Sequence, residues 1–225
     1  MPRIAIVLVI TVLATALHAQ TAPSQSEIAA YEGLHLAAHT DDAARITHLA
    51  AQGADLNARD RNDRTPAHVA AFASNDAALQ ALATAGADMN ALDDDVYDVL
   101  TIAAVANDPD MVSLALTLGN RPDLVTSVYE GTALIAASHL GHHKVVRRLI
   151  AGGAPLDHIN NLNWTALIEA VVLGDGGPDH IATVRALVGA GADITIGDRD
   201  GVTPLSHAQA RGYVEIAEII AAANQ

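Results

Sequence analysis

The chain has no cysteine, six aromatic residues and a single lysine among its 225 residues. Without cysteine it forms no disulfide framework, no thiolate metal site and no cysteine nucleophile. Only 12 basic side chains stand against 26 acidic ones, for a net charge of -14, so it lacks the cations that bind nucleic-acid phosphates. A hydrophobic content of 51% argues against a disordered chain, because that much apolar surface can be buried.

The longest apolar run lies at the N-terminus. Arg3 precedes Ile4–Leu13, small residues follow at Ala16 and Ala19, and the chain then turns polar. This layout predicts a secretory signal peptide over residues 1–19, since ten apolar residues are too few to span a bilayer; an uncleaved anchor is the alternative. We therefore expect export to the bacterial periplasm, with secretion as the second choice, and no membrane contact after the signal is removed.

Two sequence markers recur about every 33 residues. A Thr-Pro-Ala-His-like string is clearest at Thr65–Ala71, and a Gly-Ala-Asp string is clearest at Gly53–Asp55. Threonine is a good helix N-cap, proline fits the first turn, and glycine favours the left-handed conformation that ends a helix. Each copy thus predicts a short inner helix, an amphipathic outer helix and a turn, stacked on its neighbours. The six copies begin at positions 32, 65, 98, 132, 165 and 203.

The strings TPAHVAA, GADLNARD and GADITIGDRDGVTPL resemble ankyrin repeats over about residues 25–225. The resemblance implies an all-α fold, an α-solenoid of about six stacked repeats with β-hairpin fingers, in one domain over residues 20–225. Ser24–Glu27 fits a capping box for the first helix. Five extra residues near Gly174–Pro178 are placed between the two helices of the fifth repeat. The repeats are expected near 25–60, 61–93, 94–126, 127–160, 161–198 and 199–225.

The resemblance also implies that a protein partner meets the concave face, formed by finger tips and exposed positions of the inner helices. Counting from each repeat start places four of the six aromatic residues there; large residues that fill gaps between fingers and helices are the alternative. The same count also places Arg64, Val128, Leu140 and Leu173 on this face. The predicted protein-binding residues are Phe72, Asp94, Asp95, Tyr97, Tyr129, His139, Leu162 and Trp164.

Charge is unevenly distributed along the repeats. Residues 65–120 contain eight aspartates and neither lysine nor arginine, and Asp93–Asp95 with Asp98 lie on one predicted finger. A basic partner would be attracted there; a solvated surface is the alternative, and calcium is disfavoured because the glycine and distal glutamate of an EF-hand loop are missing. The basic cluster of Lys144, Arg147 and Arg148 is expected on the solvent face of an outer helix.

Eleven histidines raise the question of metal or haem binding. The resemblance implies structural roles for His35 and His68, at the histidine position of the family's Thr-Pro-Leu-His string, and for His142 in its Gly-His turn. His139, His142 and His143 have ligand-like spacing, but no matching acidic ligand is evident from the sequence.

The sequence contains no G-x-S-x-G, H-E-x-x-H or P-loop motif. We therefore expect a non-enzymatic, monomeric protein-interaction scaffold without a cofactor. Its expected role is to bind one protein on the concave face as an accessory, inhibitory or immunity protein. The alternative is an accessory protein that handles haem or a metal for a periplasmic haem enzyme.

Overall fold

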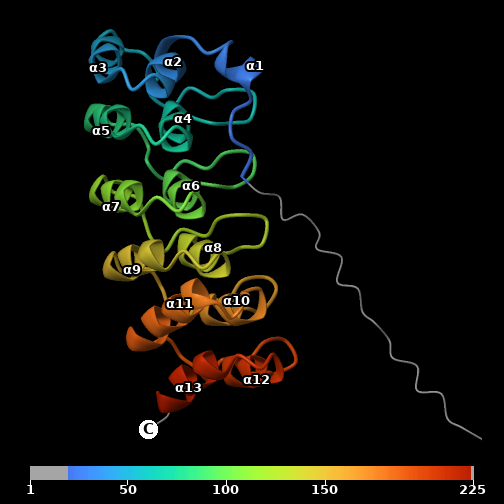
Figure 1. Ribbon diagram of the computed structural model, residues 1–225. Coiled ribbons are helices and arrows are strands. Elements are labelled where there is room, and N and C mark those ends of the chain that lie inside the picture. Colours follow the sequence, from blue (N-terminus) through green and yellow to red (C-terminus); the bar gives the residue numbers. More distant parts are fainter. Residues whose placement is uncertain (1–19, 224–225) are drawn as a thin grey trace, which may run out of the picture.

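The computed structural model describes residues 20–223, and the predicted signal peptide lies outside them. The described chain is a stack of helix pairs (Figure 1), which confirms the predicted all-α solenoid. Within residues 20–223, strand-like pairing is limited to one isolated bridge between Thr126 and Gly131, so the fingers are turns and not the β-hairpins with paired strands that the resemblance implied. The helices are α1 (Gln25–Ile28), α2 (Gly33–His39), α3 (Ala43–Ala51), α4 (Pro66–Phe72), α5 (Asp76–Ala85), α6 (Val99–Val105), α7 (Pro109–Thr117), α8 (Ala133–His139), α9 (His143–Ala151), α10 (Ala166–Val172), α11 (Pro178–Gly189), α12 (Pro204–Ala210) and α13 (Val214–Ala222).

The helices form two columns. Figure 1 shows the inner helices α2, α4, α6, α8, α10 and α12 in one column and the outer helices α3, α5, α7, α9, α11 and α13 in the other. The loops that lead into the inner helices project away from the outer column, and these loops are the fingers. Each finger is named here after the repeat whose inner helix it precedes. A surface made of fingers and inner helices therefore runs along one side of the whole stack.

The six repeat starts predicted from the sequence are the N-cap residues of the inner helices. At five of them the side chain accepts a hydrogen bond from the backbone N–H three residues later, and Glu32 is the exception. Such a bond satisfies one of the N–H groups that a helix start leaves without a partner. A capping Thr or Asp is thus the local cause of five of the six starts, and among these five it is followed by proline at Pro66 and Pro204. The five capping residues are Thr65, Asp98, Thr132, Thr165 and Thr203.

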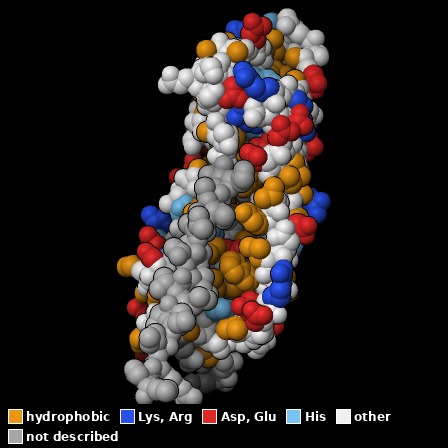
Figure 2. Space-filling view, turned by 90° about the vertical axis from the view of Figure 1, so that its right-hand side faces the viewer, with side chains coloured by type: hydrophobic (Ala, Val, Ile, Leu, Met, Phe, Trp, Pro, Cys, Tyr) orange, Lys and Arg blue, Asp and Glu red, His pale blue; other side chains and the backbone are white. Residues whose placement is uncertain are grey.

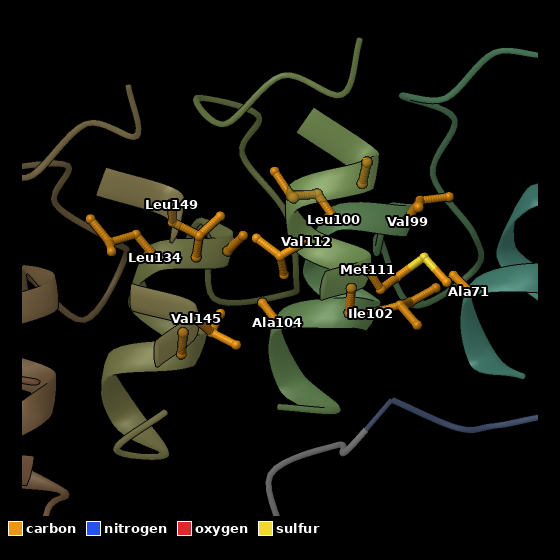
Figure 3. Close-up of a cluster of buried hydrophobic side chains, with 14 of the residues drawn as sticks. Ala71, Val99, Leu100, Ile102, Ala104, Met111, Val112, Leu134, Val145 and Leu149 are labelled. Atoms are coloured by element: carbon orange, nitrogen blue, oxygen red, sulfur yellow. The ribbon is translucent and has the colours of Figure 1, made fainter. Parts of the chain in front are cut away.

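The hydrophobic core runs continuously along the stack. Figure 3 shows Leu134, Val145 and Leu149 of one helix pair facing Val112 and Ala104 of the preceding pair, and all five side chains are buried. One helix pair could not bury this surface alone, so burial is shared between neighbours and stability depends on the interfaces between repeats.

Three histidines, of which His68 is buried and the other two are half-buried, tie neighbouring repeats together. The Nε2 of His35 lies 3.0 Å from the Arg64 carbonyl oxygen, and the Nε2 of His68 lies 3.0 Å from that of Tyr97. Burial lowers the pKa of His68 to about 4, so its ring is neutral at physiological pH. His142 contacts the backbone of the preceding inner helix in the same way, with its Nδ1 3.0 Å from a carbonyl oxygen.

The N-terminal segment takes the place of the finger that the first repeat lacks. Ser24 forms the predicted capping box with Glu27. The guanidinium of Arg64 donates to Glu27 Oε1 at 2.5 Å, to Asp60 Oδ2 at 2.9 Å and to the Thr21 carbonyl oxygen at 3.1 Å. Arg64 is 1% exposed, so its predicted place on the open face is wrong. The reason is that residues 20–31 fold over finger two.

The insertion in repeat five lies between α10 and α11, as predicted. It is held from two sides, because the Tyr213 hydroxyl donates to the Gly174 carbonyl oxygen at 2.9 Å and the Nε2 of His180 lies 3.0 Å from the His139 carbonyl oxygen. A Cβ atom at Gly174 would overlap a backbone oxygen of α10 and the His180 ring. The glycine is therefore required by close packing.

Candidate protein-binding site

Four of the five fingers are closed by the same backbone hydrogen bond. The first finger residue donates its N–H to the carbonyl oxygen four residues later, at 3.0 Å in each case. The side-chain oxygen of that first residue, an Asp or Asn, accepts backbone N–H groups two and four residues on. This is an Asx turn, which needs little tertiary support. The four fingers are finger two (60–64), finger three (93–97), finger five (160–164) and finger six (198–202).

Finger four (126–131) is one residue longer. Its closing bond runs from the Thr126 N–H to the Gly131 carbonyl oxygen at 2.8 Å, five residues apart. The extra residue accounts for the 34-residue spacing between repeat starts 98 and 132. Ser127 adopts a left-handed conformation with φ 66°, and the side chain of Val128 is 57% exposed. The extra residue in finger four is thus accompanied by an apolar side chain, that of Val128, which is exposed to solvent.

Fingers four and five are joined by two hydrogen bonds. Asn161 donates its backbone N–H to the Tyr129 carbonyl oxygen and its Nδ2 to the Val128 carbonyl oxygen, both at 3.0 Å. Finger four is held on its other side by the Ser127 N–H, which donates to the Val96 carbonyl oxygen at 2.8 Å. These bonds hold the two finger tips in a defined position.

Exposed apolar side chains concentrate on repeats four and five. Six of the seven large hydrophobic side chains that are exposed within residues 20–223 lie between residues 125 and 173, and Val214 is the seventh. Figure 2 looks onto the finger side and shows hydrophobic side chains over the middle and lower part of the stack. We call the set at the finger tips and inner-helix ends the apolar patch. It consists of Val128, Tyr129, Leu140, Leu162, Trp164 and Leu173.

Three of the predicted binding residues lie in the apolar patch. Leu162 is exposed, while Tyr129 and Trp164 are half-buried and keep part of each ring at the surface. His139 is half-buried at the end of α8, next to Leu140. The structure therefore brings together the residues predicted from repeats four and five.

The residues predicted from repeats two and three are placed differently. Asp94 is exposed and Asp95 half-buried on finger three. Phe72 is half-buried and packs against the core, and Tyr97 is 8% exposed within the core itself. For these two aromatic residues the structure agrees with the gap-filling interpretation, because both side chains pack within or against the hydrophobic core.

The acidic cluster on finger three divides into structural and surface groups. The Asp93 carboxylate accepts the N–H groups of Asp95 and Tyr97 at 3.1 and 2.9 Å. Burial, together with the neighbouring Asp95 carboxylate, raises the pKa of Asp93 to about 6. Asp98 is buried as an N-cap, and burial raises its pKa as well. Only Asp94 and Asp95 are therefore placed to meet a partner.

The three closely spaced histidines do not converge. The Nδ1 of His139 lies 3.1 Å from Glu169 Oε2, the Nδ1 of His143 lies 3.2 Å from Asp179 Oδ1, and His142 contacts a backbone carbonyl. Within the described part of the chain, no group of three or more His, Cys, Asp or Glu residues could hold a metal ion. Sequence reasoning missed Glu169, whose signal was a lone acid among the apolar residues of α10.

The outer column presents ordinary polar helices. Lys144, Arg147 and Arg148 are exposed on α9, as predicted. Over residues 20–223, none of the helices has both the length and the apolar character that a membrane crossing requires.

Comparisons with known proteins place these features in a wider context. The family model for ankyrin repeats in three copies matches residues 100–198. The ankyrin repeat protein YahD of Escherichia coli K12 is 36% identical over 190 residues, which are 84% of this chain and 94% of that protein. The crystal structure of an ankyrin repeat domain from Acinetobacter baumannii AYE is 40% identical, with a TM-score of 0.80 over 85% of this chain and 97% of that domain.

A chain in the complex of the predatory endopeptidase Bd0816 with the immunity protein Bd3460, from Bdellovibrio bacteriovorus, is 22% identical to this one. Its TM-score is 0.69, over 85% of this chain and 98% of that one. At this identity the likeness concerns the fold alone.

Proposed function

This chain belongs to the ankyrin repeat family of protein-interaction scaffolds, and we propose that it binds one protein partner through the apolar patch of repeats four and five. The supporting observation is that four of the seven large hydrophobic side chains exposed within residues 20–223 lie in this patch, namely Val128, Leu140, Leu162 and Leu173. Exposed apolar residues scattered singly need no explanation, but a gathered set on one face is typical of an interaction site. Tyr129 and Trp164 add aromatic rings of the kind that often contribute most to binding energy.

Electrostatics favours a partner with a basic surface. Asp94 and Asp95 lie on finger three, beside finger four at the edge of the apolar patch. Residues 65–120 carry no lysine or arginine, and the chain has a net charge of -14. A basic partner would be steered to this side and would keep its rate advantage only at low ionic strength.

We also propose that the protein acts in the periplasm, as a monomeric accessory or inhibitory protein such as an immunity protein. The N-terminal pattern of residues 1–19 and the lack of cysteine support this compartment. Fractionation of cells that express the full chain with a C-terminal tag tests it: processed protein in the periplasmic fraction is expected, and full-length protein in the cytoplasm would contradict it. The alternative role in haem or metal handling has less support, because the histidines of α8 and α9 have separate partners.

The binding site is tested by two substitutions in the apolar patch, of which one introduces a charge and the other removes an aromatic ring. Leu162→Asp and Trp164→Ala should each reduce partner capture from periplasmic extract at least tenfold, since both change side chains that a partner would cover. Val214→Asp is the matched control, because Val214 is equally apolar and more exposed but lies on α13, outside the patch.

All three variants should keep the helical circular dichroism and the cooperative unfolding of the parent chain, since none of the three residues is fully buried. Undiminished capture by both Leu162→Asp and Trp164→Ala would contradict the site. Equal loss by Val214→Asp would show that the effect is not specific to the patch.

A further inference from the structure

A buried carboxylate lies beneath the apolar patch, between the inner helices α8 and α10. The side chain of Glu169 is on α10 and is 6% exposed. Its Oε1 accepts a hydrogen bond from Asn160 Nδ2 at 2.9 Å, and its Oε2 lies 3.1 Å from the Nδ1 of His139. Both carboxylate oxygens are therefore occupied by groups of the protein, as a buried charge requires.

This carboxylate determines how His139 meets the surface. In a neutral imidazole, a carboxylate at Nδ1 selects the tautomer with a proton on that nitrogen, which leaves Nε2 with a lone pair. The side chain of His139 is 19% exposed, and no hydrogen bond within residues 20–223 involves its Nε2. An oriented acceptor, backed by a buried negative charge, therefore lies next to Leu140 at the edge of the apolar patch.

The surroundings of this acceptor are apolar and carry charges of both signs. Leu140 follows His139 directly, Leu173 ends the next inner helix, and both are exposed. The exposed charges on the neighbouring fingers are acidic, namely Asp94 on finger three and Glu130 on finger four. Two arginines also reach this side of the stack. Arg211 donates to the Val172 carbonyl oxygen at 3.2 Å, next to Leu173, and Arg199 of finger six donates to the Asn161 carbonyl oxygen at 3.1 Å.

We propose that the His139–Glu169 pair receives a lysine or arginine side chain of the partner protein. The cation would donate to His139 Nε2 close to the buried charge of Glu169, while its aliphatic stem would lie along Leu140 and Leu173. This rests on the proposed function and specifies the anchoring group of the partner. A neutral donor would satisfy the acceptor but would gain nothing from the carboxylate behind it.

The probe is a random library of displayed twelve-residue peptides. Peptides are selected for binding to the full chain at pH 8, where an imidazole is ordinarily neutral. Selected peptides should be enriched in lysine or arginine next to leucine or aromatic residues. Their affinity should fall at least tenfold on Leu162→Asp, on His139→Leu and on Glu169→Gln. His48→Ala, on the exposed side of α3, is the control and should leave affinity unchanged.

A peptide in which norleucine replaces the cationic residue separates direct recognition from a structural role. It should bind the parent chain at least tenfold more weakly than its lysine counterpart, and this difference should disappear on His139→Leu. A difference that persists there, or a selected pool without excess cations that still requires Leu162, would overturn the inference and leave the proposed function standing. Peptides indifferent to Leu162→Asp, or no selected peptides at all, would count against the proposed function itself.

Discussion

Fingers three and five have the same backbone and opposite surface chemistry. Each begins with an Asx residue whose side chain accepts two backbone N–H groups, and each has a left-handed residue in its fourth position. Finger three reads Asp-Asp-Asp-Val-Tyr and carries charge, whereas finger five reads Asn-Asn-Leu-Asn-Trp and carries apolar side chains. The turn thus depends on two positions only, and the remaining positions are free to carry binding chemistry.

At the last position of each finger, the exposure of the side chain depends on which segments pack against it. Arg64 in finger two and Tyr97 in finger three are buried, while Trp164 in finger five is half-buried. All three occupy the same place in the repeat. The N-terminal segment covers the first, whereas Trp164 keeps part of its ring open. Equivalent positions therefore become a core position in one half of the molecule and a position of the proposed binding patch in the other.

The largest expected effect on the free energy of unfolding comes from replacing Arg64, a buried residue at this last finger position. Arg64→Met leaves the carboxylates of Glu27 and Asp60 without their cation and should lower the free energy of unfolding by about 3–5 kcal/mol. Urea unfolding followed by circular dichroism measures it. Arg121→Met, which removes an exposed ion pair with Asp123, is the control and should change nothing measurable; a similarly small effect at Arg64 would contradict the structural role of the N-terminal segment.

An exchange at the fourth finger position should have a smaller effect, of opposite sign in the two fingers. Val96 is a β-branched residue with φ 63°, while Asn163 has φ 65° in the same place. Asparagine tolerates this conformation and valine does not. Val96→Asn should raise the unfolding free energy by about 1 kcal/mol, and Asn163→Val should lower it by about 1–2 kcal/mol. Thermal unfolding of both variants checks this, and changes of the same sign would refute it.

The smallest expected change in the free energy of unfolding comes from a substitution at the first finger position, and it depends on pH. The folded-state pKa of Asp93, about 6, lies above its ordinary 3.8, so the ionised carboxylate destabilises the fold above pH 6 and this cost fades as the pH falls toward 4. Asp93→Asn should therefore stabilise by about 1 kcal/mol at pH 7.5 and by almost nothing at pH 4. Asparagine fits because Asn160 makes the same two backbone bonds.

Asp198 in finger six is the contrasting control. Its pKa is lowered, chiefly by the Val202 N–H and also by His207, whose Nε2 lies 2.7 Å from the carboxylate. Asp198→Asn should therefore destabilise at pH 7.5. A gain in stability there, or a gain for Asp93→Asn that is independent of pH, would remove the electrostatic explanation.

Local signals in the sequence were sufficient to predict the helices and half of the candidate site. The repeat starts located the N-caps of the inner helices, and the count from each start located Tyr129, Leu162 and Trp164. The same count was wrong for Arg64, because it does not take into account that residues 20–31 cover finger two. It also passed over Glu169, since a lone acid in an apolar helix becomes meaningful only when His139 of the neighbouring repeat lies beside it.

The order of helices and turns followed from the sequence alone, because helix caps and left-handed glycines are interactions over a few positions of the chain. The tertiary structure decided which of the repeated positions remain open, which acids are buried and which histidine faces a carboxylate. These properties depend on the contact between one repeat and the next, about 30 residues away along the chain, where chemically different side chains meet at equivalent sites.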